Sequence, residues 1–212
     1  MGAWEVAVVS SSMPASITAV EESVRQEFRT TAAAREELPV LSDWGVEDFS
    51  ETVHSLGINY LAVVGRRTGR VAATEYPVRL RASGRTGSMA PAWVIPDVVW
   101  WDRDSRQVVL LGEFERYEPG GAKRQLLQEK VRNLLLAHRE LGTGSRVLVL
   151  LLWTVSGVPV QGLDDFRSLI RYGFRTPGGW NVAGLERESQ LIVATAIFTA
   201  FEGRLRLKEI LL

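Results

Sequence analysis

Three carboxylates in the middle of the chain have a spacing suited to chemistry. Glu113 and Glu115 lie two positions apart in the apolar run Val108–Arg116, and Asp97 opens the apolar run before it. Residues two apart in a strand project from the same face. Antiparallel pairing of the two runs would place Asp97 beside the end of the strand that carries Glu113. The sequence therefore predicts that three acidic groups converge on one surface.

Gathering three carboxylates costs electrostatic repulsion and desolvation, so such a cluster normally holds a cation or shares a proton. Carboxylate oxygens are hard ligands that suit Mg²⁺ or Mn²⁺, ions that keep several waters and bind substrate phosphates. A cation of this kind orients a water, lowers its pKa and stabilises developing charge on a phosphate. The pattern thus predicts metal-assisted hydrolysis of a phosphodiester bond.

The composition excludes several other chemistries. The 212 residues include no cysteine, which rules out disulfides, thiol nucleophiles and thiolate-bound metals, and the two histidines, His54 and His138, are expected to pack or to face solvent. Lys and Arg number 25, as do Asp and Glu. A chain with no net charge has no global basic field, so any site for a polyanion must be local.

Basic residues are concentrated on either side of the acidic motif. The stretch 66–85 holds six arginines against Glu75 alone, and the stretch 119–146 is also rich in lysine and arginine. Arginines in a loop rich in glycine and serine are suited to gripping phosphates. The residues predicted to contact nucleic acid are Arg66, Arg67, Arg81, Arg85 and Lys123.

The N-terminal third is predicted to contain two helices and a hairpin. Apolar residues spaced three and four apart indicate a helix over 16–37, with Ser16 as N-cap, and a shorter one over 46–56 that ends at Gly57. The β-like runs 60–64 and 71–78 flank a glycine-bounded turn and predict a hairpin.

The remainder of the chain is predicted to alternate strands with helices. The runs 93–101 and 108–116 form two antiparallel strands, and 146–154 is apolar enough for a strand buried on both faces. This order indicates one α/β domain over 1–212, with a mixed sheet flanked by helices. The other expected elements are a helix around Leu127, Val131, Leu134 and His138 ending at Gly142, a helix around 163–170, a buried strand over 191–198 and an edge strand over 204–212.

The acidic motif and its neighbours resemble a known superfamily. Pro96-Asp97, then Glu113-x-Glu115 at the end of an apolar strand, then a helix bearing Lys123 and Lys130, is similar to the PD-(D/E)XK nucleases, the restriction-endonuclease-like fold. That fold has a helix, a β-hairpin carrying the acidic motif, a helix and a further strand. The resemblance covers roughly residues 16–154, and its specific part is confined to 96–130.

The resemblance implies roles for individual residues. Asp97 and Glu113 would be the metal ligands, with the main-chain carbonyl of Phe114 as a third. Most members have lysine where this chain has Glu115. Some families move the basic residue to the next helix, so Lys130 is the candidate for a displaced lysine, with Lys123 in reserve.

The superfamily often adds an acidic ligand from its first helix. Glu21 lies nearer the apolar stripe of the helix 16–37 than Glu22 does, which favours Glu21 as a metal ligand. Glu47 and Glu51 compete with it, because the shorter helix could be the one that precedes the sheet.

These observations predict a DNA endonuclease that depends on Mg²⁺ or Mn²⁺, acting in restriction, defence or repair. Two alternatives remain open. One is an inactive nuclease-fold protein that binds nucleic acid or a partner subunit, since Glu115 replaces the usual lysine; the other is a metal enzyme acting on a small phosphate ester. The short chain suggests a homodimer or a larger complex. Without a leader or an apolar stretch of about 18 residues, a soluble cytoplasmic protein is expected.

Overall fold

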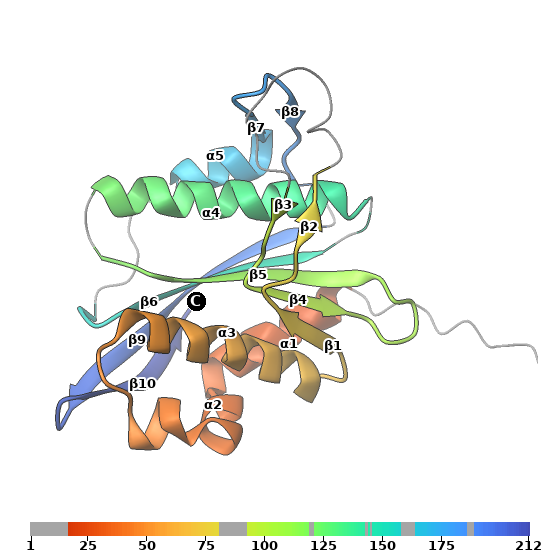
Figure 1. The fold of residues 1–212 in the computed structure, drawn as a ribbon. Helices are drawn as coiled ribbons and strands as arrows, with labels where there is room; N and C mark the ends of the chain where they lie inside the picture. The colour runs from red at the N-terminus through yellow and green to blue at the C-terminus, as the bar shows by residue number, and fades with distance from the viewer. Residues whose placement is uncertain are drawn as a thin grey trace, which may run out of the picture.

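A six-stranded mixed sheet forms the centre of the molecule, and helices cover both of its faces (Figure 1). The computed structural model describes residues 17–80, 93–118, 121–142, 144, 146–157, 164–185 and 189–212, without the side chains of 121–123, 164 and 165. The predicted α/β class is confirmed. The strand order of the six-stranded sheet is β1-β4-β5-β6-β9-β10. The strands are β1 (Val71–Thr74), β4 (Val98–Trp101), β5 (Val108–Arg116), β6 (Val147–Thr154), β9 (Gln190–Phe201) and β10 (Arg204–Leu211).

The sheet combines an antiparallel half with a parallel centre. β1 pairs antiparallel with β4 and β4 with β5, whereas β5, β6 and β9 run parallel and β10 returns antiparallel along β9. Every residue of β6 is buried, as its unbroken apolar run predicts. Two short two-stranded sheets lie outside this one: β2 (Val78–Arg79) with β3 (Trp93–Val94), and β7 (Phe174–Arg175) with β8 (Asn181–Val182).

The helices are divided between the two faces. On one side lie α1 (Ile17–Thr30), α2 (Ala32–Glu37), the short π-helix η1 (Val40–Trp44) and α3 (Ser50–Arg67), and on the other side lie α4 (Gly121–Glu140) and α5 (Asp164–Tyr172) (Figure 1). Each face has its own apolar layer, one including Phe28, Leu61 and Phe114, and the other Leu111, Val131 and Leu150. The predicted helix over 16–37 divides at Thr31, which adopts φ +50°; Ser16 lies outside the described residues.

The predicted hairpin of 60–64 and 71–78 is wrong. Residues 60–64 continue α3, while Val71–Thr74 pairs with β4 instead. A fully buried apolar run has no clear period, so it fits a helix as well as a strand. Gly57 does not end a helix either: it lies inside α3, where an added Cβ would overlap the ring of Phe114. Both errors have the same cause. Where α3 packs against β5 it carries small and apolar residues, and these resemble a strand and a helix end in the sequence.

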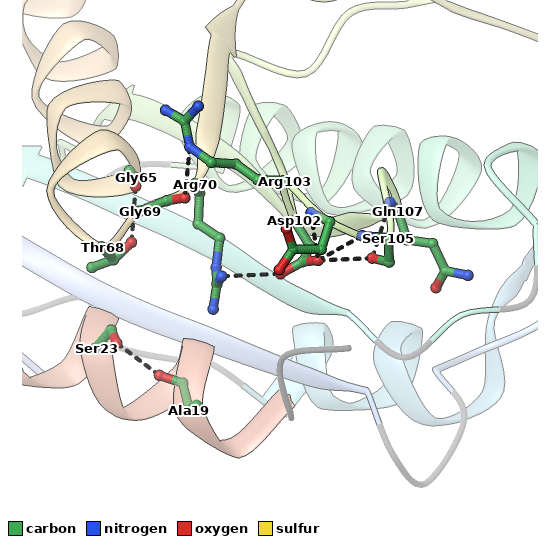
Figure 2. Close-up of polar contacts among 11 residues, drawn as sticks. Ala19, Ser23, Gly65, Thr68, Gly69, Arg70, Asp102, Arg103, Ser105 and Gln107 are labelled. Atoms are coloured by element: carbon green, nitrogen blue, oxygen red, sulfur yellow. Dashed lines mark hydrogen bonds and ion pairs between the residues drawn. The ribbon is translucent and has the colours of Figure 1, made fainter. Parts of the chain in front are cut away.

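The turn between β4 and β5 is held by one carboxylate. Asp102 accepts hydrogen bonds from the backbone N–H and the hydroxyl of Ser105 at 2.9 and 3.0 Å, and Arg70 pairs with it at 3.0 Å (Figure 2). The Ser105 backbone N–H is the main cause of the lowered pKa of Asp102, although burial opposes it. Asp102 therefore stabilises the turn, a common role for an aspartate at such a position.

The last turn of α4 is anchored by a buried guanidinium. Arg146 donates to the carbonyl oxygens of His138, Leu141, Gly142 and Gly144 at 2.9–3.3 Å, and its Nη1 lies 3.3 Å from His138 Nδ1. A cation at a helix C-terminus satisfies carbonyls that lack helical partners. Burial, aided by the Arg146 charge, lowers the pKa of His138 to about 4.

We expect Gly57→Ala to destabilise the protein, by about 1–3 kcal/mol, because the new methyl group overpacks against Phe114. Helix propensity alone predicts the opposite sign, a gain of about 1 kcal/mol. Urea unfolding measures the difference, with Arg66→Ala on the exposed side of α3 as the control. A stabilised Gly57→Ala variant would contradict the observed packing.

The state of His138 predicts a dependence of stability on pH. The unfolded chain takes up a proton near pH 6.5 and the folded protein only near pH 4, so the free energy of unfolding falls as the pH is lowered between these values. The loss attributable to His138 is at most about 3 kcal/mol. His138→Gln should remove this component, and wild-type and variant curves that stay parallel from pH 7 to pH 4 would contradict it.

Candidate active site at the carboxyl end of β5

Asp97 is positioned by the pairing of β4 with β5. Val98 lies opposite Gly112, which places Asp97 beside the end of the β5 segment that carries the glutamates. The backbone N–H of Phe114 donates to Asp97 Oδ2 at 2.8 Å, and Asp97 is buried. The predicted convergence of the two runs is therefore confirmed. This hydrogen bond fixes the aspartate to the peptide unit that joins Glu113 to Phe114.

The alternation of β5 directs the two glutamates to the face covered by α4. Phe114 faces the opposite layer, against α3, so the predicted division of the motif between two faces is confirmed. Glu113 is only 1% exposed and lies opposite Leu150 of the central strand β6. Glu115, two residues further along the strand, is half-buried. The strand therefore places one carboxylate deep in the structure and one near its surface.

Lys130 of α4 lies among all three carboxylates. Its Nζ is 2.8 Å from Glu113 Oε2, 3.8 Å from Asp97 Oδ1 and 3.7 Å from Glu115 Oε2. The spacing along its helix singles out this lysine, and the structure places it at the acidic motif. One ammonium thus compensates a concentration of negative charge that would otherwise be unfavourable.

Burial and neighbouring charge act in opposite directions on this pair. Burial is the main reason that the pKa of Glu113 lies well above its usual value, and Asp97 raises it further while Lys130 lowers it. Burial lowers the pKa of Lys130, but Glu113, Asp97 and Glu115 outweigh it and hold that pKa above its usual value. Lys130 consequently stays charged. The second oxygen of Glu113, Oε1, is buried and has no hydrogen-bond partner among the described residues.

A cleft of about 380 Å³ opens beside this cluster, where the two helical layers meet at the end of β5. Glu115 and Lys130 form one wall, and the first turns of α3 form the other. Arg116 stacks on the ring of Trp153 at 4.8 Å and pairs with Asp48 and Glu118. The lining residues are Ser50, Glu51, His54, Ser55, Glu115, Arg116, Lys130 and Trp153.

His54 is a member of the site that the sequence analysis missed. Its Nε2 lies 3.8 Å from Asp97 Oδ1, and its ring is 6.1 Å from that of Phe114. From the sequence, His54 is expected to be a packing or surface histidine, because local patterns do not show that its helix lies beside the acidic motif. Its place in the first turns of α3, the helix directly before the sheet, is the signal that could have found it.

The donor set suits a divalent cation that keeps much of its water. Asp97 and Glu113 supply carboxylate oxygens, and the unpartnered Oε1 of Glu113 is a buried acceptor that a cation could use. Within the part of the chain that the structure describes, however, no three His, Cys, Asp or Glu side chains form a metal-binding group. Two carboxylates match Mg²⁺ or Mn²⁺, which bind through one or two carboxylates and waters, better than a cation that needs a full protein cage.

The structure does not bring Glu21 to the cluster. It lies in α1, where it pairs with Arg25 one turn along the same helix at 2.7 Å. Of the competing acidic residues, Glu51 lines the cleft, because α3 and not α1 is the helix whose start faces β5. Glu21 is therefore not carried forward as a ligand.

Of the predicted nucleic-acid contacts, the structure describes Arg66 and Arg67, and neither lines this cleft. Arg66 and Arg67 end α3, about 18 Å along the helix from His54, and Arg67 pairs with Glu36 and Glu37. Arg81, Arg85 and the side chain of Lys123 lie outside the described part of the structure.

No family model matches the chain, and no curated protein or solved structure is significantly similar to it. Across the residues described, no helix is both long and apolar enough to cross a membrane.

We expect Lys130→Met to destabilise the protein by about 2–4 kcal/mol at pH 8 in EDTA, because the buried carboxylates lose their compensating charge. Adding Glu113→Gln should recover most of this loss, since it removes the charge that Lys130 compensates. Chemical unfolding measures both variants. Lys208→Met, which removes an exposed lysine paired with Glu209, is the matched control and should change little. Equal effects of Lys130→Met and Lys208→Met would contradict a compensating role.

Proposed function

We propose that this protein is a metal-dependent DNA endonuclease of the PD-(D/E)XK type. The observation that carries the proposal is the placement of Lys130 among Asp97, Glu113 and Glu115 beside an open cleft. A buried acid pair, a nearby ammonium and access for substrate form a set of groups suited to phosphodiester hydrolysis. The proposal includes a cytoplasmic location, where such an enzyme would meet DNA.

The topology supports the same proposal. With β2 and β3 set aside in their own small sheet, α3 is followed along the chain by the antiparallel strands β1, β4 and β5, then by α4, and then by β6 parallel to β5. This is the order of helix, acidic hairpin, helix and further strand that the sequence resemblance implies. Asp97 lies at the start of the second of these strands and Glu113 near the end of the third, as the motif requires.

The roles of the residues follow from their positions. Asp97 and Glu113 would hold Mg²⁺ or Mn²⁺, with the Phe114 carbonyl as a further oxygen. When bound, the cation supplies an activated water and stabilises charge on the phosphate. The Lys130 ammonium, charged and close to the cleft, stabilises a phosphate oxygen as negative charge develops. The Phe114 N–H holds Asp97 in place, so Asp97 needs no rearrangement before it binds.

A second function has one observation in its favour. Glu115 stands where most active members have lysine, and Glu51 and Asp48 add negative charge near the cleft. These acidic groups disfavour a phosphate unless a cation binds first. An inactive nuclease-fold protein that binds nucleic acid or a partner subunit would tolerate them. Binding without cleavage distinguishes this function from the first.

The deciding experiment is cleavage of plasmid and single-stranded DNA in Mg²⁺, Mn²⁺ or EDTA. We expect cleavage that requires a metal ion and falls at least about 100-fold in Asp97→Asn and in Glu113→Gln, as expected for loss of a group that stabilises the transition state. Asp97→Asn retains an oxygen that accepts the Phe114 N–H bond, so the fold should persist. Circular dichroism checks it.

Asp104→Asn provides the matched control, because this acidic residue lies exposed in the turn between β4 and β5, at the other end of β5. It should cleave like the wild type. Cleavage that survives both Asp97→Asn and Glu113→Gln overturns the proposed site. Pure protein that binds DNA but cuts none of these substrates under any metal supports the second function.

A further inference from the structure

The charges of the site create a competition between a lysine and a metal ion. In the structure, the ammonium of Lys130 lies against Glu113 Oε2 and within 3.8 Å of Asp97 Oδ1. These are the two carboxylates that would bind a divalent cation. A divalent cation on these carboxylates, even on the unpartnered Oε1 of Glu113, would lie close to the Lys130 ammonium. The two positive charges would repel each other strongly, because the local dielectric is low around a residue that is 1% exposed. A bound cation therefore requires a different position for Lys130.

We propose that Lys130 is an internal counter-ion that must leave Glu113 before a divalent cation binds, and that Glu115 receives its ammonium. This inference rests on the proposed function, since it concerns the same cation site. It makes Glu115 a positioning residue that acts through Lys130. Glu115 would thus hold the displaced lysine at the edge of the cleft, where a phosphate could meet it.

The geometry supplies a short path for this exchange. Lys130 Nζ is 2.8 Å from Glu113 Oε2 and already within 3.7 Å of Glu115 Oε2. A lysine carries its charge on a flexible stem with several rotatable bonds, so rotation of the side chain can exchange one carboxylate for the other. Lys130 and Glu115 both line the cleft, whereas Glu113 does not contribute to its wall. The exchange thus moves positive charge from the interior towards the opening.

The same exchange accounts for the glutamate at the usual lysine position. Because α4 supplies the lysine, the strand position two residues after Glu113 can hold a glutamate, whose carboxylate accepts the Lys130 ammonium. Glu115 pairs with the lysine from the surface side, and Glu113 pairs with it from the buried side. The ammonium thereby remains paired in both arrangements, which avoids the cost of leaving a partly buried charge without a partner.

The test is a measurement of Mn²⁺ affinity by isothermal titration calorimetry, without DNA. The variants are Lys130→Met, Glu115→Gln and their double mutant, with Lys208→Met as the control for loss of a surface lysine. We expect Lys130→Met to bind Mn²⁺ at least about tenfold more tightly than the wild type, and Glu115→Gln at least about threefold more weakly. In the Lys130→Met background, Glu115→Gln should have no effect, because Glu115 acts through the lysine.

Each other result has a distinct meaning. Mn²⁺ binding that Lys130→Met leaves unchanged overturns the competition but leaves the endonuclease proposal standing. An effect of Glu115→Gln that persists without Lys130 overturns the positioning role, because Glu115 would then contact the metal directly. Binding in neither the wild type nor Lys130→Met overturns the cation site itself, and with it both proposals. If Lys130→Met does not fold, Glu115→Gln alone decides: unchanged Mn²⁺ affinity overturns the inference.

Discussion

The neutralisation of Glu113 is the constraint on which this structure depends. A carboxylate that is 1% exposed at the centre of a sheet is unfavourable unless a cation or a proton compensates it. The fold supplies Lys130 from α4, and this pair joins α4 to β5 beside the apolar contacts of Leu127 and Val131. Arg146 anchors the last turn of α4 and so restrains the helix that carries Lys130, which helps to keep the lysine beside Glu113.

A second constraint comes from the opposite layer. Phe114 separates the two glutamates in sequence and occupies the space that Gly57 leaves on α3. The backbone of the same residue holds Asp97. One residue therefore joins the packing of α3, the position of the aspartate and the direction of both glutamates. Close packing at this point limits how far the walls of the cleft can move.

The sequence predicted the parts of the fold that have an unambiguous period or a local pairing. The alternation in 108–116 gave the directions of Glu113 and Phe114, and the flank of the α4 stripe gave Lys130, because both depend on spacing within one element. The predicted hairpin failed at 60–64, since a run buried on all sides carries no period. The positions of His54 and Glu21 could not be predicted, because they depend on which helix faces β5, a tertiary fact that local patterns do not contain. The positions of Arg66 and Arg67 depend on the tertiary structure in the same way, since both lie at the end of α3.

The alternation of β5 also has a consequence for how this protein could evolve. Deleting or inserting a single residue between Gly112 and Arg116 would exchange the faces of a core aromatic and an acidic residue, so stability and chemistry would be lost in one step. Changes of length can accumulate safely only outside this segment. We therefore expect related chains, however far their sequences diverge, to differ in their loops and outer strands while keeping this stretch free of gaps.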